Sequence, residues 1–241
     1  MAPLIALIHA PVLGPRSWQP VAEEISRAGN EVVVPALAGF TDGGTPYAPR
    51  LIRLAADQVR AARRDGVVLV THSGAGVFVP HLAAAIGGSV VAVFADAALP
   101  SRSSGASVVD AQFLPYLREI AAEGIVPPWP LWWPEEDLSP LFPDDAAREA
   151  VCGEARPLPL EFFAERLPAL PGGWPPCPAA YVAFSQAYDR EAGVARSAGW
   201  PVRDLPGGHL HMLVSPAEVA AAITGLAEQA RTAGASLSSL P

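Results

Sequence analysis

The sequence contains no lysine, because all 16 of its basic residues are arginine. Chemistry that needs a lysine amine, such as a Schiff base or pyridoxal-phosphate catalysis, is therefore excluded for this chain. Cysteine is scarce as well: Cys152 and Cys177 are the only two, and their spacing is not that of metal ligands. We expect two reduced thiols, with a disulfide bond between them as the alternative.

Long apolar runs and large basic clusters are also missing. The first apolar run, residues 4–8, is too short for a signal sequence or a membrane span, and no basic segment precedes it. The largest basic cluster is Arg60, Arg63 and Arg64, in a chain with 24 acidic residues and a net charge of -8. Arginines at this helical spacing indicate a solvated helix face. We therefore expect a cytoplasmic protein that acts on a small-molecule substrate and binds neither nucleic acid nor a membrane.

Apolar residues recur along the chain in a regular pattern. Its 241 residues are 51% hydrophobic, which is enough for one sizeable buried core. Short apolar runs alternate with helical patterns, and this predicts an α/β fold: a mostly parallel sheet of about six strands with helices on both faces. Ligands in such sheets bind at the carboxyl ends of the strands, where His9, Ser73 and Asp96 fall. The expected strands cover residues 4–8, 31–35, 67–70, 90–95, 179–184 and 202–205.

One long segment interrupts this alternation of strand and helix patterns. Many of the 27 prolines cluster between residues 97 and 176, together with helical patterns at 109–123 and 144–151. Such a segment is too apolar for a linker, so we divide the chain into a core of residues 1–96 and 177–241 and a Pro/Trp-rich helical cap, residues 97–176, over the strand ends. Its tryptophans either line an apolar pocket or form the small core of the cap itself.

Residues 66–76 read Gly-Val-Val-Leu-Val-Thr-His-Ser-Gly-Ala-Gly, a buried-strand pattern that stops at Ser73 and is followed by a helical pattern at 75–86. A serine on such a tight turn is held in strained backbone geometry, and only small neighbours leave room for it. Its hydroxyl then projects at the top of the sheet, beside a helix N-terminus that can stabilise an oxyanion. The alternative is a glycine-rich turn whose serine merely caps the helix.

This stretch resembles the nucleophile elbow of the α/β-hydrolase fold superfamily, with Thr71 and Ala75 where that family usually has glycines. The resemblance covers nearly the whole chain outside the cap. It implies a Ser-His-Asp triad in which an imidazole takes the proton of Ser73 and a carboxylate fixes the imidazole tautomer. The family order of nucleophile, acid and histidine places the base at His209, after a Gly-Gly pair, and the acid at Asp189, with Asp96 as the alternative.

The resemblance also implies an oxyanion hole. Its donors would be the backbone N–H of Gly74 and an N–H in the loop after the first strand. That loop reads His-Ala-Pro-Val over residues 9–12, and Pro11 has no N–H to donate. If Pro11 occupies the donor position, one hydrogen bond is lost; if the loop is rearranged, Val12 is the second donor.

These residues favour a serine hydrolase that cleaves an ester or thioester of an apolar small molecule. No metal or organic cofactor is implied, since the sequence has no dinucleotide-type glycine loop and no ligand-spaced His/Cys cluster. The missing N–H at Pro11 suggests a non-hydrolytic alternative, a lyase, eliminating enzyme or cyclase that uses His209 as acid and base. A catalytically silent small-molecule binder is the third hypothesis. The expected pocket residues are His9, His72, Trp129, Trp132, Trp133 and His211.

Overall fold

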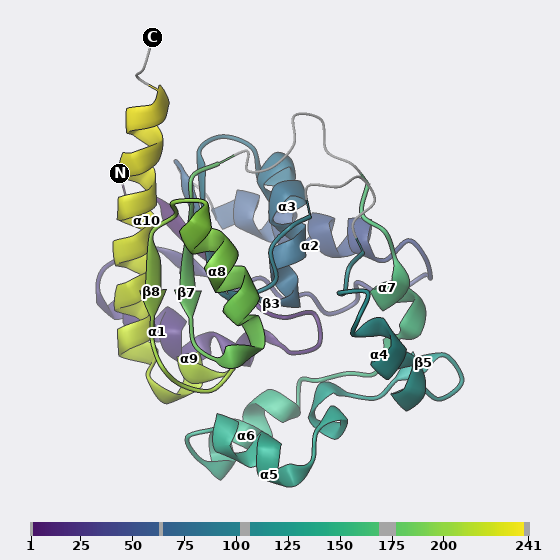
Figure 1. Ribbon diagram of the computed structural model, residues 1–241. Helices are drawn as coiled ribbons and strands as arrows, with labels where there is room; N and C mark the ends of the chain where they lie inside the picture. Colours follow the sequence, from purple (N-terminus) through teal and green to yellow (C-terminus); the bar gives the residue numbers. More distant parts are fainter. Residues whose placement is uncertain (1, 63–64, 102–106, 169–176, 239–241) are drawn as a thin grey trace.

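The computed structural model describes residues 2–62, 65–101, 107–168 and 177–238. Its central sheet has six strands in the order β2-β1-β3-β4-β7-β8, and every neighbouring pair is parallel (Figure 1). The predicted α/β class and strand number are therefore confirmed. The strands are β1 Leu4–Ile8, β2 Val32–Val33, β3 Val67–Ser73, β4 Val90–Ala97, β7 Ala179–Ala183 and β8 Val202–Asp204.

Helices cover both faces of this sheet. Helix α1 (Gln19–Arg27) packs against α10 (Pro216–Ser238) on one face, whereas α2 (Ala48–Ala62) packs against α3 (Val79–Ile86) on the other. Helix α8 (Asp189–Ser197) connects β7 to β8 and packs against both. Because both faces are covered, the central strands are buried, which explains their apolar runs at residues 67–70 and 90–95.

Between β4 and β7 lies a separate group of short elements, which we call the insertion segment (residues 107–168). In Figure 1 it lies beside the carboxyl ends of the strands, at the lower right in teal. The helix expected at 109–123 begins only at Leu114, because Pro115 is tolerated in a first turn but not further along. The elements are α4 Leu114–Ile120, β5 Ile125–Val126, α5 Glu135–Leu138, α6 Asp145–Cys152, β6 Leu158–Pro159 and α7 Leu160–Ala164.

Two carboxylates tie the insertion segment to the core. Glu165 accepts hydrogen bonds from the backbone N–H groups of Tyr47 (2.6 Å) and Ala48 (2.7 Å), at the N-terminus of α2. Glu154 accepts one from the backbone N–H of Arg16, at 2.8 Å. These bonds fix the segment next to the strand ends, although its predicted role as a cap over a substrate remains a prediction.

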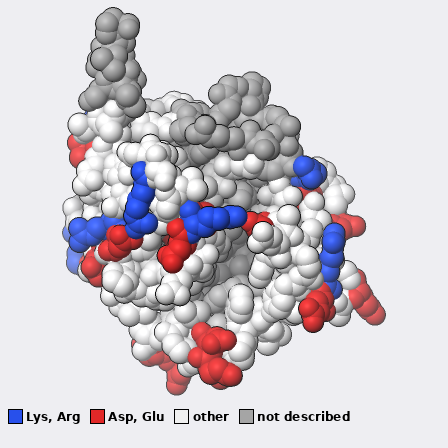
Figure 2. All heavy atoms as spheres, in the orientation of Figure 1, with Lys and Arg blue, Asp and Glu red and all other residues white. Residues whose placement is uncertain are grey.

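On the face shown in Figure 2, charges of opposite sign lie side by side over α8, where Arg196 pairs with Asp204 and Arg190 with Asp110 and Glu191, while the charged side chains seen at the lower edge are acidic. Within the described ranges, no helix combines the length and apolarity needed to cross a membrane. Both cysteines are free thiols, as expected.

Candidate active site

Ser73 occupies a strained turn at the end of β3. Its backbone has φ 55° and ψ −134°, and residues Gly74–Phe78 continue as a 3-10 helix that leads into α3. The turn is tight, because a Cβ built on Gly76 would overlap the carbonyl oxygen of Ala98. Positive φ is costly for a residue with a side chain, so the fold gives up stability to hold this hydroxyl in place. This is the geometry that the sequence predicted for Ser73.

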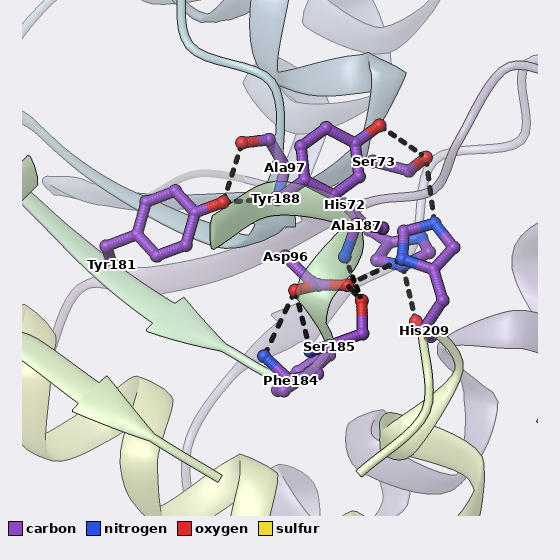
Figure 3. A network of polar contacts seen from close by, with 10 residues as sticks. All are labelled: His72, Ser73, Asp96, Ala97, Tyr181, Phe184, Ser185, Ala187, Tyr188 and His209. Carbon is purple, nitrogen blue, oxygen red and sulfur yellow. Dashed lines mark hydrogen bonds and ion pairs between the residues drawn. The ribbon is translucent and has the colours of Figure 1, made fainter. Parts of the chain in front are cut away.

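A continuous chain of hydrogen bonds starts at this hydroxyl (Figure 3). The Ser73 Oγ lies 3.0 Å from Nε2 of His209, and Nδ1 of the same ring lies 2.6 Å from Oδ2 of Asp96. An ionised carboxylate can only accept, so Nδ1 carries the ring proton and Nε2 presents a lone pair to the serine hydroxyl. The arrangement can therefore remove a proton from Ser73 and stabilise the imidazolium that forms.

The carboxylate that holds His209 is that of Asp96, the alternative acid, and not that of Asp189, the preferred one. Asp189 is the exposed first residue of α8. Asp96 instead lies in an irregularity of the sheet, where His72 pairs with Ala95 and Ser73 pairs with Ala97. A bulge of this kind re-aims a side chain, and the backbone of Asp96 has a φ of 45°.

Four hydrogen bonds surround the Asp96 carboxylate. Besides His209, Oδ1 accepts from the backbone N–H groups of Phe184 (3.1 Å) and Ser185 (3.0 Å), and Oδ2 accepts from the Ser185 hydroxyl (2.6 Å). Burial alone would raise the pKa of Asp96, but the bonds from His209 and Ser185 outweigh it and hold the pKa below its ordinary value. The carboxylate therefore stays ionised at neutral pH.

Tyr188 is a second partner of the serine. Its hydroxyl oxygen lies 3.2 Å from Ser73 Oγ, and its ring stacks on the His209 ring with centroids 5.5 Å apart. The residue ends the short 3-10 helix Gln186–Tyr188 after β7. Neither Tyr188 nor Ser185 was expected from the sequence, although their place just after a strand, at the carboxyl edge of the sheet, was a signal that could have marked them.

The other histidines differ in their relation to the serine. His72 donates from Nε2 to the backbone carbonyl of His209 at 3.0 Å, and burial, aided by its electrostatic interaction with His209, lowers its pKa to about 3. His9 donates from Nδ1 to the carbonyl of Ala10, and burial lowers its pKa to about 4. Both are neutral at physiological pH and lie near the strand ends. The Nε2 atom of His211 lies 3.9 Å from the carboxylate of Glu218.

The loop after β1 makes a turn in which the N–H of Leu13 donates to the carbonyl of Ala10, at 2.9 Å. Pro11 and Val12 lie inside this turn, beside the strand that carries Ser73. Gly74 begins the helix that follows Ser73, where the first N–H groups have no partner within the helix. The assignment of Gly74 and Val12 as oxyanion donors stays a prediction.

The three tryptophans assigned to the substrate pocket belong to the insertion segment. Trp129 and Trp132 are buried, and the indole Nε1 of Trp132 donates to the carbonyl of Pro127 at 2.7 Å. Trp133 stacks on Tyr116 and is 39% exposed. These contacts favour the alternative that the aromatics form the core of the segment, and a role in substrate binding stays a prediction.

No group of three or more His, Cys, Asp and Glu side chains is placed to bind a metal ion within the ranges that the structure describes. The expectation that the protein uses no metal or organic cofactor therefore rests on the sequence alone.

Solved structures with the same fold include enzymes of different activities. An extracellular α/β-hydrolase from a Paenibacillus species, reported to share structural and functional homology with tobacco salicylic acid binding protein 2, is 18% identical, with a TM-score of 0.68 over 90% of this chain and 96% of that one. Tomato methylketone synthase I in complex with 2-tridecanone is 14% identical, with a TM-score of 0.71 over 95% and 99%. A pyrethroid hydrolase from Sphingobium faniae JZ-2 is 21% identical, with a TM-score of 0.60 over 93% and 97%.

Sequence comparison identifies the family. No curated protein matches the chain in sequence. The model of the alpha/beta hydrolase family matches residues 5–222, which include residues of all six strands and the residues around Ser73. The chain therefore belongs to the alpha/beta hydrolase family.

Proposed function

We propose that this protein is a serine hydrolase that cleaves an ester or thioester of an apolar small molecule through an acyl-enzyme on Ser73. The observation that carries the proposal is the unbroken hydrogen-bonded path from Asp96 through His209 to Ser73. A catalytically silent binder has no need for this path or for the strained backbone of Ser73.

The geometry supports a two-step reaction. As Ser73 Oγ attacks the acyl carbon, its proton passes to Nε2 of His209, and the carbonyl electron pair moves to the carbonyl oxygen. The electron pair then returns from the carbonyl oxygen, the bond between the acyl carbon and the leaving oxygen or sulfur breaks, and His209 gives its proton to that leaving atom. In the second step a water molecule gives a proton to the same Nε2 and bonds to the acyl carbon. The bond to Ser73 Oγ then breaks, His209 gives its proton to Oγ, and the acid is released. Asp96 remains ionised throughout and stabilises the charged imidazole.

The apolar character of the substrate is argued from the insertion segment. Aromatic side chains cluster there beside the strand ends: Phe113 packs on Trp132, and Trp132 packs on Phe163. These aromatic rings offer apolar surface to a bound molecule beside the strand ends.

A fluorophosphonate probe tests the proposal, because it reacts with an activated serine and leaves a stable adduct. We expect intact-protein mass spectrometry to find one adduct on the wild-type protein and none on the Ser73→Ala variant. The Ser185→Ala variant, which keeps Ser73, is the matched control and should still be labelled, although more slowly. An unlabelled wild-type protein, or labelling that survives Ser73→Ala, would refute the proposal.

A non-hydrolytic enzyme of the same fold is the second candidate, favoured by the missing N–H at Pro11. One of the similar structures is indeed a synthase. In that case His209 moves protons and Ser73 only orients the substrate. A reaction that persists in Ser73→Ala and is lost in His209→Ala would favour this candidate over hydrolysis.

A further inference from the structure

The loop after β1 lacks one backbone donor beside the serine. Pairing of β1 with β3 brings Ile8 opposite Thr71, so the chain that leaves β1 runs alongside the turn at Ser73. A backbone N–H from this loop is one of two donors that normally hold the oxyanion in this kind of site. Pro11 cannot supply one. With proline at position 11, this loop has one backbone donor fewer to offer to acyl transfer at Ser73, and Val12 carries the remaining N–H inside the turn.

Tyr188 approaches Ser73 from the other side. It comes from the turn after β7, and in the sheet order β4 lies between β7 and β3. Among the described residues, two side chains lie within hydrogen-bond distance of Ser73 Oγ: His209, through Nε2, and Tyr188, through its hydroxyl. The ring is fixed by stacking on His209. Figure 3 shows both side chains converging on the serine oxygen.

The direction of these two hydrogen bonds follows from the donors available. Nε2 of His209 is an acceptor, so the Ser73 hydroxyl donates to it. The Tyr188 hydroxyl must then be the donor toward Oγ. Burial raises the pKa of Tyr188 to about 12, so the phenol keeps its proton at neutral pH.

We propose that the Tyr188 hydroxyl donates a hydrogen bond to the oxyanion of the tetrahedral intermediate on Ser73, in place of the backbone N–H that Pro11 lacks. This role rests on the proposed serine-hydrolase function. When Ser73 attacks, its Oγ gives its proton to His209 and forms the new bond to the acyl carbon. The carbonyl electron pair moves to the carbonyl oxygen, which is bonded to the same carbon as Oγ. In the assigned role this oxygen lies on the side of Oγ that faces the Tyr188 hydroxyl. Tyr188 transfers no proton.

The test combines Tyr188→Phe with a substitution that restores an N–H. Tyr188→Phe keeps the ring on His209 and removes only the hydroxyl, so we expect kcat on p-nitrophenyl butyrate to fall about 100-fold, the loss typical for one oxyanion donor, with KM little changed. Pro11→Ala regains a backbone N–H. In that background Tyr188→Phe should cost less than about tenfold, because the two donors then share one task.

Controls separate this role from a structural one. Tyr47→Phe removes a hydroxyl that bonds to the carboxylate of Glu161, outside the residues assigned to the site, and should leave kcat unchanged. Circular dichroism verifies that each variant folds, and Pro11→Gly provides a second background if Pro11→Ala does not.

The outcomes are distinct. Three results would overturn the oxyanion role: Tyr188→Phe keeps kcat within threefold of wild type, it lowers kcat by the same factor with proline and with alanine at position 11, or it changes KM alone. In each of these cases, Ser73-dependent fluorophosphonate labelling would still uphold the hydrolase. If the wild-type protein is neither labelled nor active on esters, the proposed function and the Tyr188 role fail together.

Discussion

Replacing Asp96 by asparagine should disable the serine through the tautomer of His209. The two backbone N–H groups of Phe184 and Ser185 point at Oδ1, so the new side-chain amide has to place its oxygen there and its NH2 group toward His209. That NH2 group is a donor, which forces the imidazole to carry its proton on Nε2 and to accept at Nδ1. With Nε2 protonated, His209 can no longer take the proton of Ser73.

The expected loss is large. A wrong tautomer of this kind costs about 10,000-fold in kcat in a serine protease, and we expect about 1,000- to 10,000-fold here, or about 4 to 5.5 kcal/mol of transition-state free energy. The assay is the second-order rate of fluorophosphonate labelling, together with ester turnover. Asp189→Asn is the matched control and should stay within about twofold of wild type, because Asp189 is exposed at the start of α8. Asp96→Asn that keeps more than a tenth of the activity, or Asp189→Asn that loses as much, would refute the tautomer argument.

Three further predictions concern stability, measured as the free energy of unfolding in urea. Ser73→Gly should be about 1 kcal/mol more stable than the equally inactive Ser73→Ala, because glycine tolerates a φ of 55°; equal stabilities would show that this turn is not strained. Gly76→Ala should lower the free energy of unfolding by about 3 kcal/mol, since the new Cβ would overlap a backbone oxygen. Gly74→Ala should lower it by less than about 1 kcal/mol, because no atom lies within 4 Å of a Cβ at that position. Similar losses at both positions would contradict this reasoning. Burial lowers the pKa of His9 to about 4, so the unfolded chain binds the proton more tightly and stability falls as the pH drops from 6.5 toward 4. From pH 7 to pH 5 this amounts to about 2 kcal/mol, and His9→Gln should lack that part of the pH dependence; an unchanged pH profile would show that His9 is not its source.

Much of the site was predictable because it lies at the ends of regular elements. The apolar run before Ser73 and the small residues after it specify a strand, a tight turn and a helix, and the structure contains all three. His209 was found for the same reason, since its Gly-Gly loop follows the last strand and must return to the carboxyl edge of the sheet. The local sequence pattern and the order of the strands are therefore sufficient to predict a site residue whose position is set by the end of a strand.

The acid and the tyrosine were not predictable in this way. Asp96 reaches His209 because the pairing of β4 with β3 shifts at this residue, and a register shift depends on contacts between strands that no local pattern encodes. Asp189 looked favourable because it follows β7 closely, but it lies beyond the 3-10 helix, at the start of α8 on the exposed ion-paired face. Because this short helix separates Asp189 from the end of β7, the carboxylate that bonds to His209 is that of Asp96.

The position of the acid and the position of Tyr188 are connected. Because the carboxylate comes from β4, the turn after β7 does not have to supply one. It instead contributes the N–H groups and the hydroxyl that hold Asp96, and this contact fixes the backbone at Ser185. Tyr188 follows three residues later on the same short helix, so the bonds to Asp96 also determine where its hydroxyl lies relative to Ser73. Removing the Ser185 hydroxyl should therefore weaken both the hold on Asp96 and the approach of Tyr188 to the serine.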